Sequence, residues 1–456
     1  MPSLGKILIF GMAVASTAMP ARANAAEIEV GPPNAATLQQ VLDASADGDT
    51  VRLAAGSYPG PLVLTKAVVL EGVPGAVIVG HEVGSVITLT APRAVVRGLT
   101  IKGSGFDLAA LDSGVFVAQS ATGAVVEDNL ITGNLNGVYL HGAADAIARR
   151  NEIQGLTAGR MSEAGNGVSL WNAPGAQIVD NTISFGKDGI STNASRHNVF
   201  TGNRFRNLRF AVHYMYTNDS VIAGNVSEGN LVGYAIMFSS RLTITDNVSD
   251  GDRDHGLLLN FANGSTVRRN KVVGRLQPSE RWTMGGTRAD TTDLPVGEAR
   301  PAEGEQMLGP EKCVFIYNAN RNVLESNLFQ NCAIGIHFTA GSEGNEITGN
   351  AFVSNRNQVK YVGSRYLDWS KKGRGNYWSD NPSFDLDGDG LGDGPYRPND
   401  IIDTVLWTAP QAKVLTTSPA VQIIRWAQAQ FPSLLPGGVI DSKPLMAPPA
   451  PKDGSR

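Results

Sequence analysis

An asparagine that returns about every 22 residues is the feature that most restricts how this 456-residue chain can fold. Successive asparagines are separated by 22, 30, 22, 22, 22, 23, 57 and 23 residues, at Asn129, Asn151, Asn181, Asn203, Asn225, Asn247, Asn270, Asn327 and Asn350. The separations of 30 and 57 fit single repeats with insertions near residues 157–166 and 276–312. Short alternating segments such as Gly137–His141 and Gly335–Thr339 recur between the asparagines, and a period of two indicates β-strands.

Repeats of this length cannot each bury a core, but stacked coils bury one continuous core between them. The sequence therefore predicts an all-β chain, a right-handed parallel β-helix over residues 26–362. The recurrent asparagine suits either a left-handed corner or an inward side chain whose amide bonds to the next coil. We expect the amphipathic segment Ala35–Leu42 to form a helix that caps the N-terminal end, where strand edges would otherwise be exposed.

The two ends of the chain differ from the repeats. Residues 1–25 combine Lys6, an apolar run and a small-residue cleavage site, which is typical of a signal peptide. No later stretch approaches the ~20 consecutive apolar residues of a membrane helix. Residues 363–412 form an extension rich in Asp, Gly and Trp, residues 413–440 contain a predicted helix from Ser418 to Phe431, and the proline-rich residues 441–456 are predicted to be disordered.

Charge and cysteine content exclude some classes of protein. With 38 Lys and Arg against 42 Asp and Glu, the net charge of -4 lacks the basic excess that nucleic acid binding requires. Two cysteines are too few for a disulfide scaffold or a zinc ribbon. Cys313 and Cys332 fall in adjacent coils but in different columns, so we expect two buried thiols, although export of the chain favours a disulfide.

Alignment of the repeats on their asparagines separates inward from outward side chains. Positions nine and eleven after the asparagine are apolar, so positions ten and twelve should face outward. Position ten holds Tyr139, Ser169, Ser191, His213, Ala235, Leu258, Phe315 and His337. Position twelve holds His141, Trp171, Asn193, Met215, Met237, Asn260, Tyr317 and Thr339.

Met215 and Met237 should therefore be neighbours on the outer face, with His213 beside them. Two thioethers and an imidazole form a soft ligand set that suits Cu(I) better than zinc, magnesium or calcium. His141 and His337, in the same two columns, are further candidate ligands. The alternative is that these methionines and aromatic residues form a contact patch for a partner protein.

Two other clusters carry possible chemistry. Asp385, Asp387, Asp389 and Asp393 resemble the first nine positions of a calcium-binding loop, although position twelve is Tyr396 instead of a bidentate Glu. The alternative is an acidic loop held by its own Asx turns. The segment Asp252–Gly256 places Asp254 beside His255, which could abstract the proton next to a uronate carboxyl, although a turn with solvated charges is the commoner arrangement.

Four segments closely resemble the NosD family of periplasmic nitrous oxide reductase maturation proteins. They are Phe210–Asp219, Asp254–Asn260, Gly375–Asp380 running into 385–400, and Ser418–Val421 through to Gly437–Gly438. The resemblance covers nearly the whole mature chain. It implies a periplasmic protein that is no enzyme and that helps to build the copper-sulfur catalytic site of nitrous oxide reductase.

The resemblance also implies partners. They are the membrane subunit and the ATPase of an ABC transporter, a copper chaperone lipoprotein and apo nitrous oxide reductase, with membrane attachment only through the transporter. Met215, Met237 and His213 match the family's segment and are the implied Cu(I) ligands. Val421, Ile424, Trp426 and Phe431 are candidates for docking on the membrane subunit, or for a cap on the solenoid. The rival function is a periplasmic uronate epimerase or lyase that uses Asp254 and His255.

Overall fold

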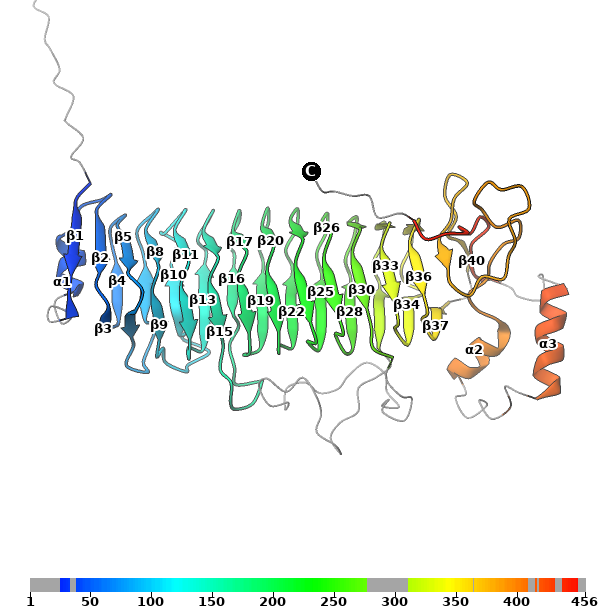
Figure 1. Ribbon diagram of the computed structural model, residues 1–456, viewed down its shortest axis with the longest axis horizontal. Coiled ribbons are helices and arrows are strands. Elements are labelled where there is room, and N and C mark those ends of the chain that lie inside the picture. Colours follow the sequence, from blue (N-terminus) through cyan, green and yellow to red (C-terminus); the bar gives the residue numbers. More distant parts are fainter. Residues whose placement is uncertain are drawn as a thin grey trace, which may run out of the picture.

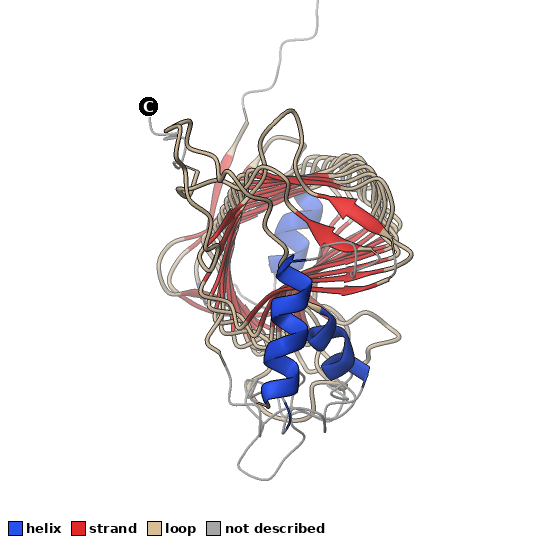
Figure 2. Ribbon diagram, turned by 90° about the vertical axis from the view of Figure 1, so that its right-hand side faces the viewer, coloured by secondary structure: helices blue, strands red, loops and turns tan. Residues whose placement is uncertain are grey.

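The computed structural model describes residues 25–32, 38–276, 311–363, 365–408, 415, 418–430 and 437–449. Over these residues the predicted parallel β-helix is confirmed, because strands of successive coils pair in parallel and form three long sheets (Figures 1 and 2). Nearly all of the predicted signal peptide and residues 277–310 of the second insertion lie outside the described residues. No helix in the described part of the chain is both long and apolar enough to cross a membrane.

Each coil contributes one strand to each of three sheets, which we call A, B and C. Sheet A contains β1 (Glu27–Val30), β2 (Thr50–Leu53), β5 (Val69–Gly72), β8 (Val95–Arg97), β11 (Val125–Glu127), β14 (Ile147–Arg149), β17 (Gln177–Val179), β20 (Val199–Thr201), β23 (Val221–Ala223), β26 (Thr243–Thr245), β29 (Thr266–Arg268), β32 (Val323–Glu325) and β35 (Glu346–Thr348). Sheet B contains β3 (Gly56–Pro59), β6 (Ala76–Val79), β9 (Thr100–Lys102), β12 (Leu130–Thr132), β15 (Glu152–Gln154), β18 (Thr182–Ser184), β21 (Arg204–Arg206), β24 (Val226–Glu228), β27 (Val248–Asp250), β30 (Lys271–Val273), β33 (Leu328–Gln330), β36 (Ala351–Val353) and β39 (Tyr377–Trp378). Sheet C contains β4 (Leu62–Leu64), β7 (Ile87–Leu89), β10 (Ser113–Val117), β13 (Asn136–His141), β16 (Val168–Trp171), β19 (Asp188–Asn193), β22 (Phe210–Met215), β25 (Val232–Met237), β28 (His255–Asn260), β31 (Lys312–Tyr317), β34 (Ile334–Thr339) and β37 (Asn357–Val362). The inward side chains of the three sheets form one hydrophobic core that runs the length of the solenoid.

The recurrent asparagines form a hydrogen-bonded ladder inside the solenoid. Asn203 donates from Nδ2 to Oδ1 of Asn225 at 2.9 Å, and Asn225 donates in the same way to Asn247 at 2.9 Å. Each Oδ1 also accepts the backbone N–H of the preceding asparagine in the ladder. The left-handed backbone falls instead on the residue before each asparagine, such as Asp246 with φ 59°. The inward-amide role is therefore confirmed, and the corner belongs to the neighbouring residue.

A helix covers the N-terminal end of sheet C, as the sequence predicts. Helix α1 (Leu38–Ala44) buries Leu38 and Leu42 and lies against β4, the terminal strand of that sheet. Gln39 replaces a missing strand, because its Oε1 accepts the N–H of Val63 at 2.9 Å and its Nε2 donates to the carbonyl of Val63 at 3.0 Å. The side chain thus satisfies an exposed strand edge.

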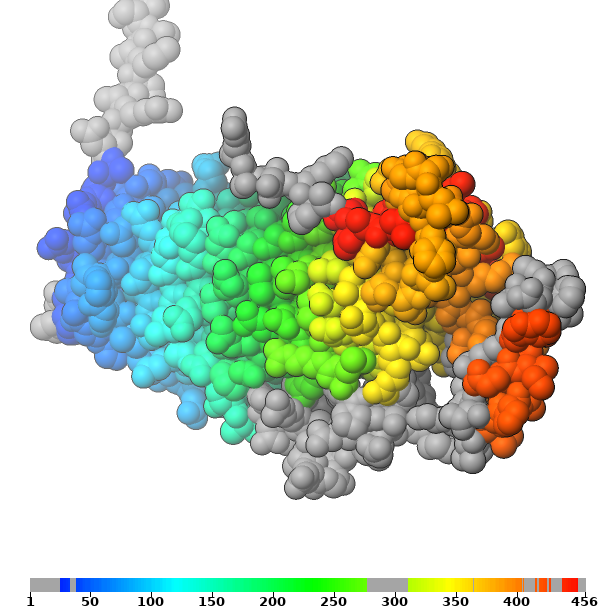
Figure 3. Space-filling model, turned by 45° about the vertical axis from the view of Figure 1, so that its right-hand side comes forward, coloured from blue at the N-terminus to red at the C-terminus, as the bar shows by residue number. Residues whose placement is uncertain are grey.

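The C-terminal extension closes the other end of the solenoid. Strands β38 (Tyr366–Asp368) and β40 (Gly438–Ile440) pair in parallel, and helices α2 (Ile401–Thr408) and α3 (Pro419–Gln430) lie beyond the last coils (Figure 1). Figure 3 shows α3, in orange-red, protruding from this end of the molecule. The predicted helix is therefore present, ending at Gln430 in the described residues.

The prediction of a disordered tail from Asp441 is wrong for residues 441–449. Asp441 is fully buried, and one of its carboxylate oxygens accepts the backbone N–H of Asn376 at 2.6 Å and Nε1–H of Trp378 at 2.8 Å. Asn376 is the last rung of the asparagine ladder, because Asn350 donates to its Oδ1. The carboxylate thus accepts the N–H that an asparagine of a further coil would otherwise accept. The proline-rich composition of this segment gives no sign of such a long-range contact.

The expectation of two free thiols is also wrong. Cys313 and Cys332 form a disulfide, with their Cα atoms 5.7 Å apart. The pairing of Lys312 with Ile334 puts Cys332 three residues out of register with Cys313. Cys332 lies at the corner that precedes β34, where the chain turns, so its distance from Cys313 does not follow the offset along straight strands.

Candidate metal centre

Sheet C places the predicted outward columns in register. Met215 of β22 pairs with Met237 of β25, and His213 pairs with Ala235 on the same two strands. His213 and both methionines are partly exposed, whereas Tyr214 between them is buried. Neighbouring coils thus present two methionines on the outer face, on backbones that lie at the ~4.8 Å spacing of paired strands.

A buried carboxylate orients His213. Nδ1 of His213 lies 3.1 Å from Oδ2 of Asp188, one coil away, and Asp188 also receives two hydrogen bonds from the guanidinium of Arg209, at 2.8 and 2.6 Å. Burial opposes ionisation of Asp188, but the charges and hydrogen bonds of Arg209 and His213 outweigh it and lower the pKa of this carboxyl. An ionised carboxylate can only accept, so Nδ1 donates to Asp188, and Nε2 is the ring nitrogen that this hydrogen bond does not use.

This arrangement suits a soft metal ion. Thioether sulfur and imidazole nitrogen favour Cu(I), and a carboxylate behind the imidazole is the usual partner of a metal-ligating histidine. Met237 also packs against a small apolar cluster on the outer face, formed by Leu231, Val232 and Ala235. An apolar surrounding excludes water and favours a weakly hydrated ion.

The other two candidate histidines lie away from this set. His141 is in β13 and His337 is in β34. Each lies three coils, or about 14 Å along the solenoid axis, from the nearer of the two methionines. The ring of His141 stacks on Trp171 at 4.7 Å. Burial, together with the charges of Lys360 and Lys312, lowers the pKa of His337 to about 3. The structure therefore does not bring His141 or His337 together with Met215 and Met237.

The predicted Asp254–His255 cluster is present but buried. Nδ1 of His255 lies 2.8 Å from Oδ2 of Asp254, outside hydrogen-bond geometry, and Nζ of Lys312 lies 3.6 Å from Oδ1 of the same carboxylate. His255 is only 4% exposed, and burial lowers the pKa of its imidazole. A base this enclosed is poorly placed to reach a bound polysaccharide.

The acidic loop brings three of its four predicted ligands together. Carboxylate oxygens of Asp385, Asp387 and Asp389 lie within 4.8 Å of one another. Asp393 instead accepts the N–H of Leu386 at 2.8 Å. Asp385 accepts the N–H of Gly388 and Gly390, and these backbone donors lower its pKa. Both alternatives, a cation loop and a set of Asx turns, agree with this geometry.

Helix α3 has an exposed apolar surface. Val421 is buried, whereas Ile424 and Trp426 are 41% and 64% exposed, so the proposed docking residues do not share one environment. Ile423, which the sequence analysis passed over, is 65% exposed. Phe431 lies outside the described residues.

A row of four exposed aromatic rings lies beside the methionines, and the sequence predicted only Tyr317 to face outward there. It consists of Tyr216, Phe238, Phe261 and Tyr317, which we call the aromatic ladder. Tyr216 stacks on Phe238 with ring centroids 5.1 Å apart, Phe238 stacks on Phe261 at 5.0 Å, and Phe261 meets Tyr317 edge-on at 5.9 Å. Tyr216 and Phe238 directly follow Met215 and Met237, so extending the repeat alignment to position thirteen would have found most of this row.

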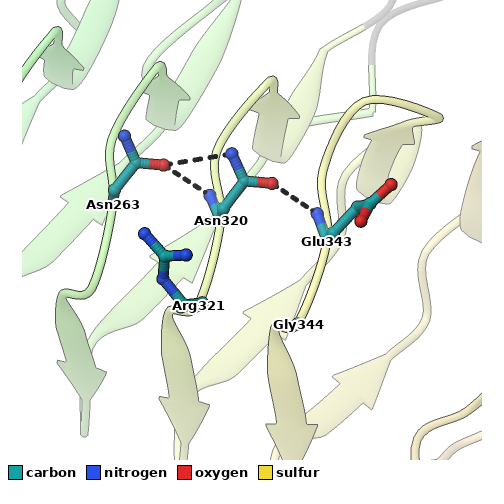
Figure 4. A pocket seen from close by; sticks show the side chains of 5 residues that line it. All are labelled: Asn263, Asn320, Arg321, Glu343 and Gly344. Carbon is teal, nitrogen blue, oxygen red and sulfur yellow. Dashed lines mark hydrogen bonds between the residues drawn. The ribbon is translucent and has the colours of Figure 1, made fainter.

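A surface cavity of about 470 Å³ lies next to the C-terminal end of this ladder. It is lined by Asn263, Asn320, Arg321, Glu343 and Gly344 (Figure 4). Oδ1 of Asn263 accepts hydrogen bonds from Asn320, whose own Oδ1 accepts the N–H of Glu343. The amides thus bind one another, and the cavity is a corner between coils.

Comparison with known sequences identifies the family. Residues 150–383 match the sequence model of the family described as "Periplasmic copper-binding protein (NosD)". The chain belongs to the NosD family. Two relatives named "Probable ABC transporter binding protein NosD" are each 40% identical to it. The relative from Stutzerimonas stutzeri aligns over 403 residues, 88% of this chain and 87% of that protein, and the one from Pseudomonas aeruginosa aligns over 410 residues, 90% and 91%.

The family resemblance expected from the sequence is thereby confirmed, and the NosD family is one of periplasmic copper-binding proteins. The relatives are named as binding proteins of an ABC transporter. Among solved structures, the Dettilon tailspike protein matches with a TM-score of 0.55 at 13% identity, over 72% of this chain and 64% of that protein. This second likeness shows the solenoid fold alone.

Proposed function

We propose that this protein is a periplasmic accessory factor, not an enzyme, for assembly of the copper-sulfur catalytic site of nitrous oxide reductase. It holds Cu(I) transiently as cargo on Met215, Met237 and His213. The observation that carries the proposal is the pairing of two partly exposed thioethers in adjacent coils, on strands that also place His213 against a buried carboxylate.

The ligand set explains why the cargo would be held and then released. Neutral thioethers bind Cu(I) without adding charge, so a partner with thiolates or more imidazoles can take the ion from them. Asp188 holds the imidazole of His213 in place with Nε2 free. The site lies on the outer face of the solenoid, where another protein can reach it.

The proposed partners follow from the family. Two relatives are named as probable ABC transporter binding proteins. We therefore assign the membrane subunit of the transporter and its ATPase as the proteins that this chain binds at the membrane. The exposed Ile424 and Trp426 of α3, at the C-terminal end, support docking there. A copper chaperone lipoprotein would deliver Cu(I) to this chain, and the copper-sulfur site would be assembled in apo nitrous oxide reductase.

The uronate epimerase or lyase receives less support. Its catalytic cluster is buried at His255, and the outward columns carry aromatic, Met and neutral polar side chains where a uronate groove would need cations. Assays for uronate epimerisation and for lyase products with the purified chain would test this rival directly.

The test of the proposal uses nitrous oxide reductase purified from a strain that lacks this gene alone. We expect its electron-transfer copper site to be present and its catalytic cluster to be missing, by copper content and visible spectrum. The gene carrying Met215→Leu and Met237→Leu should fail to restore the cluster, whereas Met161→Leu, at a buried methionine outside the site, should restore it. An intact catalytic cluster in the deletion strain would contradict the proposal.

Calcium binding by the acidic loop remains a separate proposal. Asp385, Asp387 and Asp389 offer hard oxygen ligands that suit Ca²⁺. If the loop holds this cation, a chelator should lower the melting temperature of the wild type but not of an Asp387→Asn variant. Equal melting temperatures of the wild type with chelator and with added Ca²⁺ would mean that the loop is held by its Asx turns alone.

A further inference from the structure

Three of the four residues of the aromatic ladder lie at positions where the backbone disfavours aromatic residues. Tyr216, Phe238 and Phe261 have φ values of 46°, 49° and 52°, in the left-handed region. The same corner in neighbouring coils is occupied by Asn172, Ala194 and Asn318, all with positive φ. Asn adopts this conformation readily, whereas bulky side chains adopt it rarely. Packing of the solenoid therefore does not explain why three successive coils carry aromatic rings here.

The rings are exposed to solvent. Tyr216 is 51% exposed, Phe238 and Phe261 are 39% exposed, and Tyr317 is 42% exposed. They stack on one another along the solenoid axis instead of packing into the core. A continuous exposed row of this kind is typical of a binding surface.

The two columns that carry the ladder and the methionines contain no charged side chain. From β16 to β31, the corner position and the methionine column beside it hold Trp, Asn, Ala, Met, Tyr and Phe, with no Asp, Glu, Lys or Arg. Enrichment in aromatic residues and Met together with depletion of charge is the composition of a protein–protein interface core. A charged polymer or a hydrated ion would find no complementary group here.

A partner protein that binds the aromatic ladder also lies close to the candidate metal site. Tyr216 and Phe238 directly follow Met215 and Met237 in the chain, so a protein seated on the rings also lies over the thioethers. A Cu(I) ion that passes between proteins without release needs donor and acceptor ligands in contact at the same moment. A partner that itself carries Cu(I) fits this arrangement.

We propose that the aromatic ladder is the docking surface for a copper-carrying partner protein, which presents an uncharged apolar patch around its own soft ligands. The inference rests on the proposed function and assigns the surface on which transfer takes place. Docking places the partner's ligands against Met215 and Met237 and keeps water away from the ion during exchange.

The test replaces Phe238 and Phe261 with Asn in the full chain. Asn suits the left-handed backbone, so the variant should keep the circular dichroism and melting behaviour of the wild type. Phe106→Asn, at another exposed aromatic residue, is the matched control. Binding is measured by biolayer interferometry to the Cu(I)-loaded soluble part of the copper chaperone and to apo nitrous oxide reductase. Cu(I) affinity of the chain alone is measured by competition with a chromophoric chelator.

We expect at least tenfold weaker binding to the Cu(I)-loaded chaperone, unchanged Cu(I) affinity, and no effect of Phe106→Asn. Binding of the chaperone within twofold of the wild type would overturn the docking surface, even if binding of apo nitrous oxide reductase falls. A parallel fall in Cu(I) affinity would also overturn it, because the rings would then belong to the metal site. If Met215→Leu with Met237→Leu leaves Cu(I) affinity intact while the ladder variant loses its partner, the docking surface stands and the proposed metal site fails.

Discussion

The asparagine column inside the solenoid and the methionine column outside it repeat with the same period but use their polar atoms differently. Inside, Asn225 both accepts from Asn203 and donates to Asn247, so the ladder satisfies itself. Outside, Met215 and Met237 lie side by side on paired strands and are partly exposed. The same stacking thus produces a hydrogen-bonded scaffold inside the solenoid and, on its outer face, a column of methionines that we propose as Cu(I) ligands.

Breaking the inner ladder should have the largest effect on stability. Asn225→Ala removes the acceptor of two hydrogen bonds from Asn203 and the donor to Asn247 and to the carbonyl of Phe200. We expect the free energy of unfolding to fall by about 4 kcal/mol, because several buried groups lose their partners. Urea unfolding measures this change. Asn193→Ala on the exposed face should leave the midpoint unchanged, and equal losses for both variants would refute the contrast between inside and outside.

The buried carboxyl of Glu311 gives the stability of the protein a pH dependence. Burial raises the pKa of Glu311 from 4.5 to about 7, aided by the negative charge of Asp252 and opposed by the N–H of Arg275. Because the folded state holds this proton more tightly than the unfolded chain, stability falls as pH rises from about 4.5 through 7, by on the order of 3 kcal/mol.

Melting temperatures between pH 5 and 8 measure this dependence. Glu311→Gln should flatten the decline because its side chain no longer titrates but can still accept the N–H of Arg275. If the melting temperature of the variant falls as steeply with pH as that of the wild type, the pH dependence comes from another group.

On the outer face, the carboxylate behind His213 should matter for metal affinity. Asp188→Asn removes the charge that holds Nδ1–H, and loss of such a carboxylate commonly weakens metal binding by about 10- to 100-fold. We expect at least a tenfold fall in Cu(I) affinity by chelator competition. Asp219→Asn, in an exposed ion pair with Arg241, is the control and should bind Cu(I) as the wild type does. Equal affinities for all three chains would remove His213 from the site.

The smallest effect is expected on the outer face of sheet A, where charges pair along a column as the Met residues do on sheet C. Arg97 donates to Glu71 and lies near Glu127, and its side chain is 42% exposed. Exposed ion pairs contribute little, so Arg97→Ala should lower the free energy of unfolding by about 0.5 kcal/mol. Urea unfolding at low and high salt measures it. A loss of several kcal/mol would show that outer columns also hold the scaffold together.

The repeat made the coils, their register and the outward columns predictable, because each coil repeats the same local interactions. The predictions that were wrong or incomplete concern residues beyond the last coil or at the corners between strands. Asp441 pairs with Asn376, 65 residues earlier, and no period relates the two. Cys332 lies at a corner, where strand register no longer gives distances. Tyr216, Phe238 and Phe261 of the aromatic ladder were missed for the same reason, since position thirteen follows the end of the strand.

The central claim is that Met215 and Met237 form a Cu(I) site together with His213. The most direct test is Cu(I) affinity, by competition with a chromophoric chelator, of the wild type and of the double variant Met215→Leu and Met237→Leu. Leu has nearly the volume of Met, so the circular dichroism should not change. We predict one Cu(I) per chain in the wild type and at least 100-fold weaker binding in the variant. Unchanged affinity in the variant would contradict the account.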